Sequence, residues 1–200
     1  PFLKYARHDR HHALFATLLL TGCRSGEARA LTWDNIDLTN HTLHIQHAVR
    51  QTSQGAILTE PKTPRSRRQI ALPNELVHIL QTHQNNQNPQ HPNPLNLVFP
   101  TPLGNIQSHS NLYNRHFKPL LKTANLPNIR MHDLSHTHAT LMLQAGIHPK
   151  VVSERLGHAS ITLTLDTYSH VLPNMQTESA EKLNQLLFPE TPNPPHTQPN

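Results

Sequence analysis

The sequence predicts an α+β protein that is mainly α-helical and contains one small antiparallel sheet of three strands. Two observations lead to this prediction. Apolar residues recur at helical spacing in most segments, whereas residues 42–72 change to the alternating pattern of short strands. A chain of 200 residues can form one domain of ordinary size with a tail. We expect residues 1–188 to form that domain and the Pro-rich residues 189–200 to be disordered.

Two helices are expected at the start of the chain. Residues 7–21 carry apolar side chains at helical spacing, and Gly22 supplies a C-terminal turn. Ser25 is an N-cap candidate for a short second helix over residues 25–31. Arg24 then lies at the junction of the two helices, where a guanidinium can point into a cleft, although a solvated surface arginine has the same sequence signal.

Three short strands are expected at residues 42–46, 56–59 and 68–72. The last two are joined by a basic turn over residues 60–68. Basic hairpin tips commonly contact phosphates, although turns also collect cations simply because they are solvated. Lys62 lies nearest the strand, and the other cations of the turn are Arg65, Arg67 and Arg68.

The second half of the chain is expected to be helical. We predict helices at residues 74–84, at 108–125 with a kink or restart at Pro119, and at 132–144. Further helical pieces follow to residue 170. The expected last helix is amphipathic and covers residues 174–188.

The charge balance favours a polyanionic partner. Lys and Arg number 17 against 12 for Asp and Glu, which gives a net charge of +5 and an isoelectric point near 9.7. A basic protein without a nucleic-acid partner remains the alternative. Cys23 is the single cysteine, which excludes an internal disulfide and fits a reducing cytoplasm. No apolar run reaches membrane-spanning length, so no membrane partner is expected. The chain does not begin with Met, and we expect it to be a fragment or processed piece.

The 18 histidines suggest a metal site as a further hypothesis. Two groups have helical spacing that could ligate zinc. The chain has no Cys pair and no His-Glu-x-x-His motif, so we expect no metal. The two groups are His8, His11 and His12, and His132, His136 and His138.

The segment from Met131 to His170 carries the most informative cluster of polar residues. His132 and Ser135 belong to one predicted helix and share a face of it. A second helical segment ends at His158, and Tyr168 follows ten residues later. Imidazoles gathered around a phenol are suited to the chemistry of a phosphodiester.

The first motif is Thr-Gly-Cys-Arg-Ser-Gly-Glu at residues 21–27, followed by Leu-Thr-Trp-Asp-Asn-Ile-Asp at 31–37. It resembles the first signature of the tyrosine recombinases, the phage integrase family. Lys62, in its basic hairpin, resembles the family's catalytic lysine. The remaining matches are His-Asp-Leu-x-His-Thr-His-Ala-Thr at 132–140, Leu-Gly-His at 156–158 and Thr-Tyr at 167–168. The resemblance covers roughly residues 5 to 188, in order.

The resemblance implies a catalytic domain that cuts and rejoins DNA without a metal or nucleotide cofactor. Tyr168 would attack the phosphate to form a 3′-phosphotyrosyl link, and Arg24 would hold the non-bridging oxygens. His132 and His158 would donate hydrogen bonds or exchange protons, and Lys62 would protonate the leaving 5′ oxygen. Glu27 would brace the arginines. The implied DNA contacts are Arg65, Arg67, Arg68 and Arg130.

The resemblance also implies an arrangement in space and in the cell. The five catalytic residues should converge on one basic cleft, with Tyr168 sitting back from it in the absence of DNA. The partner would be double-stranded DNA, bound by a homo-tetramer that forms from monomers on the DNA. Its location would be the cytoplasm, at the nucleoid. The helical domain that usually precedes this one in the family is not in the sequence.

One position departs from the family pattern. Ser135 occupies the place of the second active-site arginine, and a hydroxyl can neither carry the charge nor grip a phosphate in bidentate fashion. Loss of such an arginine costs on the order of 10³ to 10⁵ in rate in phosphoryl transfer. Two hypotheses therefore stand beside each other: an impaired recombinase, and a catalytically inactive DNA-binding relic of a mobile-element integrase.

Overall fold

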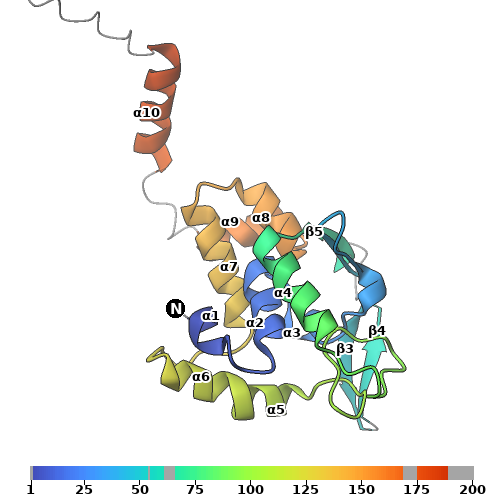
Figure 1. Cartoon of the computed structure of the whole chain (residues 1–200). Coiled ribbons are helices and arrows are strands. Elements are labelled where there is room, and N and C mark those ends of the chain that lie inside the picture. The colour runs from blue at the N-terminus through green and yellow to red at the C-terminus, as the bar shows by residue number, and fades with distance from the viewer. Residues whose placement is uncertain (1, 54, 61–65, 169–174, 189–200) are drawn as a thin grey trace, which may run out of the picture.

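The structure, a computed structural model, describes residues 2–53, 55–60, 66–168 and 175–188. It confirms the mainly helical α+β class with small antiparallel sheets. Helix α2 (His12–Thr21) is the central element, and it contacts α1 (Phe2–Ala6), α3 (Ser25–Ala28), α4 (Asn74–Asn85) and α7 (Asp133–Gln144). Figure 1 shows the helices gathered around α2, with the sheets along one side. Most of its side chains are buried, which explains why its sequence is apolar around the whole helix.

The first long helix begins later than the sequence suggested. Residues 7–11 form a turn, because the Asp9 carboxylate accepts a hydrogen bond from the His11 backbone N–H at 2.7 Å. The backbone carbonyl of Asp9 also accepts a bond from His12 N–H at 2.9 Å. An Asp side chain that captures nearby amides in this way favours a turn over a helix interior. The predicted start at residue 7 is therefore wrong.

The strands are divided differently from the prediction. The three-stranded sheet has the order β1 (Ile36–Asp37), β2 (Thr42–Ile45), β5 (Arg68–Ala71), all antiparallel. The second expected strand, at residues 56–59, instead forms a separate hairpin, in which β4 (Gly55–Thr59) pairs with β3 (Ala48–Thr52). β3 was missed because its residues alternate poorly between apolar and polar.

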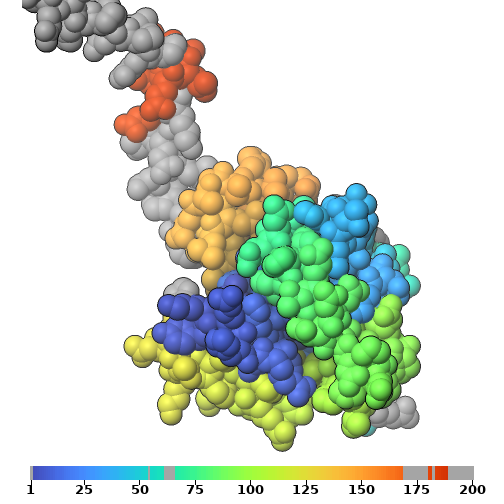
Figure 2. Space-filling model, in the orientation of Figure 1, coloured from blue at the N-terminus to red at the C-terminus, as the bar shows by residue number. Residues whose placement is uncertain are grey.

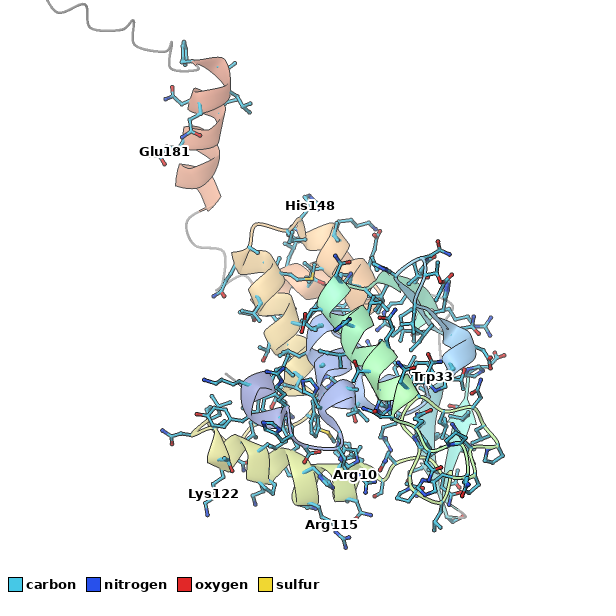
Figure 3. The ribbon with its side chains drawn as sticks, viewed as in Figure 1. Arg10, Trp33, Arg115, Lys122, His148 and Glu181 are labelled. Carbon is cyan, nitrogen blue, oxygen red and sulfur yellow. The ribbon has the colours of Figure 1, made fainter. Side chains whose placement is uncertain are left out.

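The predicted helix at residues 108–125 is interrupted by one π-helical turn. α5 (His109–Leu112) leads into η3 (Tyr113–Phe117) and then α6 (Lys118–Thr123). Pro119 has no N–H for the carbonyl four residues earlier, and a π turn directly before it accommodates that loss. The expected kink therefore takes the form of a helix with a bulge. Figure 3 shows Arg115 and Lys122 directed outward from this side of the molecule.

Two buried clusters hold the helices together. The larger one contains the rings of Phe2, Phe15 and Phe117, which meet at centroid distances of 5.3–5.7 Å. The smaller one joins α7 to α8 (Pro149–Leu156) and α9 (Ile161–Tyr168). The ring of Tyr168 belongs to this smaller cluster, and packing there fixes the position of its hydroxyl.

The last described helix, α10 (Met175–Leu187), stands apart from the other helices in Figures 1 and 2. Leu183, Leu186 and Phe188 are 55, 79 and 70% exposed, respectively. An apolar stripe without cover is the mark of a helix that meets another surface. In the ranges that the structure describes, no helix combines the length and the apolar character needed to cross a membrane. The expected disordered tail, 189–200, lies outside the described residues.

Candidate active site

A cavity of about 250 Å³ lies where the end of α2 meets α7, α8 and α9. Four of the five residues expected to be catalytic line it: Arg24, His132, His158 and Tyr168. Lys62, the fifth, lies outside the described residues, as does Arg65. The remaining lining residues are Gly22, Ser135, His136, Leu156, Leu163 and Thr167.

Gly22 allows the first motif to approach the helix that carries the histidines. Its φ is +70°, in the region that favours glycine, and its N–H donates to the Leu18 carbonyl at 3.0 Å. A Cβ at this position would lie only 2.5 Å from Cδ2 of His138 in α7. Only a glycine therefore lets α2 end so close to α7, which brings Arg24 to the cavity.

Arg24 is held in place by Glu27. The Glu27 carboxylate accepts from the Arg24 backbone N–H at 2.8 Å and from its guanidinium at 2.9 Å. The carboxylate is buried, and the Arg24 side chain keeps 41% exposure. Burial raises the pKa of Glu27, but the hydrogen bonds and charges of Arg68 and Arg24 outweigh it and lower the pKa overall. Glu27 is therefore an anion that fixes the direction of the guanidinium.

Arg68 is buried beside Glu27 and does not form part of an exposed basic face. Its guanidinium is 6% exposed and donates twice to the Glu27 carboxylate, at 3.1 and 2.8 Å. Its Nε donates to the Arg155 carbonyl at 2.6 Å. Gly157 makes room for it, since a Cβ there would lie 2.9 Å from an Arg68 nitrogen. The expectation that Arg68 contacts DNA is corrected by this burial.

His132 and His158 reach the cavity from different elements. His132 precedes α7, and Nδ1 of His158, just after α8, lies 2.8 Å from the Thr164 hydroxyl. Burial and the nearby His136 and Arg24 lower the pKa of His132. Burial, followed by the same two neighbours, lowers the pKa of His158. Both shifts favour the neutral form of the imidazole.

Tyr168 does not sit back from the cavity. Its side chain is 3% exposed, and its hydroxyl lies 2.7 Å from Nδ1 of His136. Burial raises the pKa of this phenol. No catalytic role was predicted for His136, which was considered as a metal ligand and as part of the 132–140 motif. Helical spacing places it on the same side as Ser135 and the preceding His132, and this signal could have found it.

Ser135 faces the same cavity, as its helical position indicated. It is 7% exposed, and its hydroxyl donates to the His132 backbone carbonyl at 2.7 Å. Two nearby arginines that could replace the absent cation, Arg130 and Arg155, already have partners within the protein. Arg130 forms an ion pair with Asp133 at 2.8 Å, and Arg155 donates to the carbonyls of Leu20 and Ala71, both at 3.2 Å.

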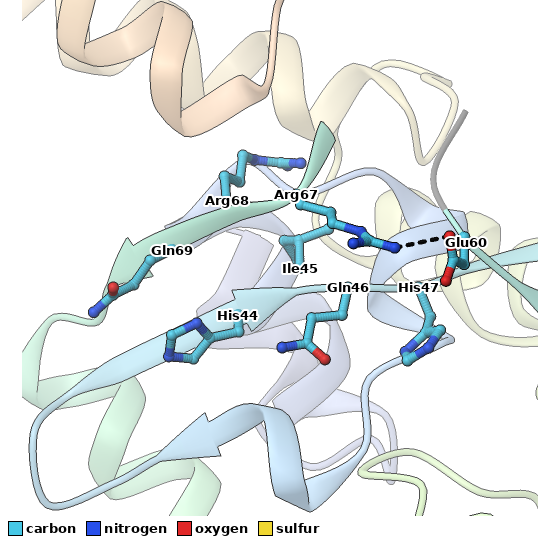
Figure 4. Close-up of a pocket in the computed structure, with 8 residues that line it drawn as sticks. All are labelled: His44, Ile45, Gln46, His47, Glu60, Arg67, Arg68 and Gln69. Carbon is cyan, nitrogen blue, oxygen red and sulfur yellow. Dashed lines mark ion pairs between the residues drawn. The ribbon is translucent and has the colours of Figure 1, made fainter. Parts of the chain in front are cut away.

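The remaining DNA-contact predictions fall on exposed arginines. Arg67 is 55% exposed and pairs with Glu60 at 2.7 Å. Figure 4 shows this pair at the edge of a hollow of about 440 Å³ beside β2 and β5, which also includes His44 and His47. Arg130 is 75% exposed where α7 begins. Both can reach a molecule that approaches from outside.

The group of possible metal ligands that the described residues bring together differs from the two histidine groups suggested by spacing. Within the described ranges, the group with suitable distances is Asp9, His11 and His116, whose ligand atoms lie within 4.8 Å of one another. Asp9 already serves as a hydrogen-bond acceptor there, with His11 Nδ1 at 3.2 Å and His116 Nδ1 at 3.0 Å. This network joins the turn before α2 to η3 and lies outside the cavity.

The fold is that of a tyrosine recombinase catalytic domain. The Tn1549 transposon integrase, solved in complex with a circular intermediate DNA, has a TM-score of 0.78 at 28% identity, covering 91% of this chain and 62% of that one. The catalytic domain of bacteriophage HP1 integrase shares the fold, with a TM-score of 0.59 at 22% identity, covering 95% of this chain and 93% of that one.

The sequence matches agree with the fold. Residues 2–175 match the phage integrase family, and the chain belongs to that family. It is 33% identical over 197 residues to a XerC-like tyrosine recombinase of Caldanaerobacter subterraneus subsp. tengcongensis, covering 90% of this chain and 50% of that protein. It is 30% identical to the ICEBs1 integrase of Bacillus subtilis, covering 86% of this chain and 48% of the relative. The chain spans about half the length of these curated relatives.

Proposed function

We propose that this chain is the catalytic part of a site-specific DNA recombinase that breaks and rejoins strands through a 3′-phosphotyrosyl intermediate. The observation that carries the proposal is the cavity itself. It gathers a tyrosine hydroxyl, a guanidinium and imidazoles from motifs that span most of the chain. A phosphodiester needs this combination, because the attacking phenol and the charge on the phosphate must both be stabilised.

Each side chain has a proposed role. Tyr168 attacks the phosphorus, and Arg24 neutralises a non-bridging oxygen with the geometry that Glu27 imposes. His132 and His158 donate hydrogen bonds to the phosphate once its charge favours their protonated forms. Lys62 protonates the 5′ oxygen as it leaves. Arg67 and Arg130, both exposed, contact neighbouring phosphates.

The proposed substrate is double-stranded DNA. The net charge of +5 supports a polyanionic partner, and the similar Tn1549 transposon integrase was solved in complex with DNA. We propose a monomer that assembles into a homo-tetramer on its DNA, acting in the cytoplasm at the nucleoid. The relatives of mobile elements, such as the ICEBs1 integrase, support integration or excision as the biological setting.

Covalent trapping tests this proposal without knowledge of the target site. The probe is a pool of nicked duplexes of randomised sequence. Cleavage releases a short fragment, so the strand cannot be rejoined and the enzyme stays covalently attached to the DNA. The expected result is an SDS-resistant adduct that maps to Tyr168 by mass spectrometry and is absent from Tyr168→Phe. Tyr113→Phe is the matched control, since that tyrosine lies outside the cavity and bonds to Asn128.

The second candidate function is a DNA-binding relic, favoured by one observation, the uncharged Ser135 in the cavity. Its signature in the same experiment is a gel shift by the wild-type chain with no adduct on any sequence in the pool. That outcome would refute the recombinase proposal and leave binding alone.

A further inference from the structure

We infer that His136 is the base that removes the proton of Tyr168 during strand cleavage, an inference that rests on the proposed function. The position is not one of the residues to which the motifs assign a catalytic role. It touches the reacting atom directly, with Nδ1 lying 2.7 Å from the Tyr168 hydroxyl. A phenol O–H at that distance can donate to Nδ1 of an imidazole whose own proton is on Nε2.

The contact is built by packing and not by sequence proximity. His136 lies in α7 and Tyr168 at the end of α9, 32 residues further along. Tyr168 belongs to the buried apolar cluster that also contains Ala139, Leu143, Val152 and Leu156. Because this apolar cluster fixes the ring, the hydroxyl is presented to one imidazole in a set direction.

The chemistry of the buried phenol calls for such a base. Burial raises the pKa of Tyr168, so the phenolate is disfavoured until a group accepts the proton. Two other imidazoles line the cavity, but Nδ1 of His158 lies 2.8 Å from the Thr164 hydroxyl. His132 meets the His136 ring edge-to-face at 5.1 Å between centroids. Among the contacts described, His136 is therefore the imidazole joined to the nucleophile.

The step balances without a co-reactant. The Tyr168 proton passes to His136 Nδ1 while the phenolate oxygen forms a bond to phosphorus. The bond between phosphorus and the 5′ oxygen breaks, and that oxygen takes a proton from the leaving-group acid. In rejoining, the incoming 5′ hydroxyl attacks phosphorus, and the imidazolium of His136 returns its proton to the tyrosine oxygen.

The charge of this imidazolium also offsets part of the positive charge that an arginine at position 135 would supply. Arg24, His132 and His158 line the same cavity as His136, and Asp133 precedes it on α7. Ser135 adds no charge to the cavity. Proton transfer to His136 therefore creates a cation beside the phosphate at the moment when negative charge builds on it.

His136→Asn separates the role of base from that of a positioning contact. An asparagine amide oxygen occupies the place of Nδ1 and can accept the phenol hydrogen bond, but it cannot take the proton. The substrates are duplexes selected with the wild-type chain from the randomised pool, each made with oxygen or with sulfur at the scissile 5′ position. A sulfur leaving group needs no protonation, so it isolates the nucleophile's side of the reaction.

We expect His136→Asn to lower single-turnover cleavage by about 10² to 10⁴ on both substrates, with unchanged DNA affinity. Its rate should also rise roughly tenfold per pH unit, because hydroxide must now take the proton. Restoration by sulfur would overturn the inference, since His136 would then be the acid for the leaving oxygen. Cleavage within about threefold of wild type on both substrates would overturn it as well.

Two controls keep the outcomes distinct. His78→Asn changes an exposed histidine of α4 and should leave cleavage unchanged. If His136→Asn lowers the melting temperature, His136→Gln is measured in its place under the same criteria. Should the wild-type chain form no adduct with the pool, the proposed function fails and this inference falls with it. Adduct formation at the wild-type rate in both variants refutes the inference alone.

Discussion

Ser135 decides how much charge the candidate site can bring to a phosphate. Its hydroxyl donates to a backbone carbonyl, and the arginines around it are committed elsewhere, Arg68 to Glu27 and Arg155 to two carbonyls. One donor to a developing oxyanion is worth about 2.7–4 kcal/mol in the transition state. Ser135→Arg should therefore raise the rate of covalent-adduct formation by at least about a hundredfold, with only a modest change in DNA affinity.

The control places the same charge on the same helix but outside the cavity. Thr137 is exposed on α7 and does not line the cavity, so Thr137→Arg should tighten DNA binding at most and leave the adduct rate as it was. Equal rates in Ser135→Arg and the wild type would show that a missing cation does not limit the chemistry. The two variants are compared by single-turnover trapping and by gel shift at one salt concentration.

His138 links the candidate site to acid stability. Its Nδ1 donates to the Leu19 carbonyl at 2.9 Å, and Nε2 accepts from Arg155 at 3.4 Å. Burial, followed by the Arg155 charge, lowers the pKa of His138 from 6.5 to about 4. The unfolded chain binds this proton near pH 6.5 and the folded chain only near pH 4, so stability falls as the pH drops through that window.

This difference in pKa between the folded and the unfolded chain lowers the free energy of unfolding by about 3 kcal/mol between neutral pH and pH 4. His138→Gln should therefore show a smaller loss of unfolding free energy over that range, measured by urea denaturation. The exposed His78 gives the matched variant His78→Gln, which should follow the wild-type curve. Burial likewise lowers the pKa of His11 to about 4, so part of the acid loss remains in His138→Gln. Parallel curves for His138→Gln and the wild type would contradict the prediction.

At the scale of elements, the approach of α2 to α7 depends on Gly22. Gly22→Ala adds a Cβ 2.5 Å from His138 and places alanine at a φ of +70°. The left-handed backbone costs about 1–2 kcal/mol and the overlap roughly 1–3 kcal/mol more. Gly146 has a φ of +76° with nothing within 4 Å of a built Cβ, so Gly146→Ala should show the backbone cost alone. Equal losses of unfolding free energy in the two variants would show that the close approach is unimportant.

The same elements show what the sequence could predict. The helix spacing around α4 and α7 and the turn at Gly22 were readable, because each depends on local pattern and chain geometry. The sequence did not indicate which strands share a sheet. β2 pairs with β5 and not with β4, and this pairing buries Leu43 against Ile70, a contact that depends on the tertiary fold. The contact of His136 with Tyr168 and the burial of Arg68 depend on tertiary packing, which no local pattern carries.

At the scale of the whole molecule, α10 lies apart from the other helices that the structure describes. Four large apolar residues at the end of the α10 segment are 55–79% exposed. Exposed apolar side chains of this kind do not stabilise an isolated monomer, and they often mark an interaction surface. They are Leu183, Leu186, Leu187 and Phe188. The exposure fits a helix that docks on a neighbouring copy once DNA brings copies together. Residues 174–200 should then contribute to assembly and not to folding.

Deletion of residues 174–200 should leave a chain with the thermal stability of the wild type that binds duplex DNA as a monomer and fails to assemble further. Leu186→Glu should weaken assembly in the same way, because it places a charge in the apolar stripe. Gln185→Glu adds the same charge one position earlier, at an exposed polar residue, and should assemble normally. Sedimentation velocity on a selected duplex measures the assembly state, and circular dichroism measures the melting temperature. If the truncated chain unfolds, α10 belongs to the core of its own domain. If the truncated chain assembles fully, the contact between copies does not depend on α10.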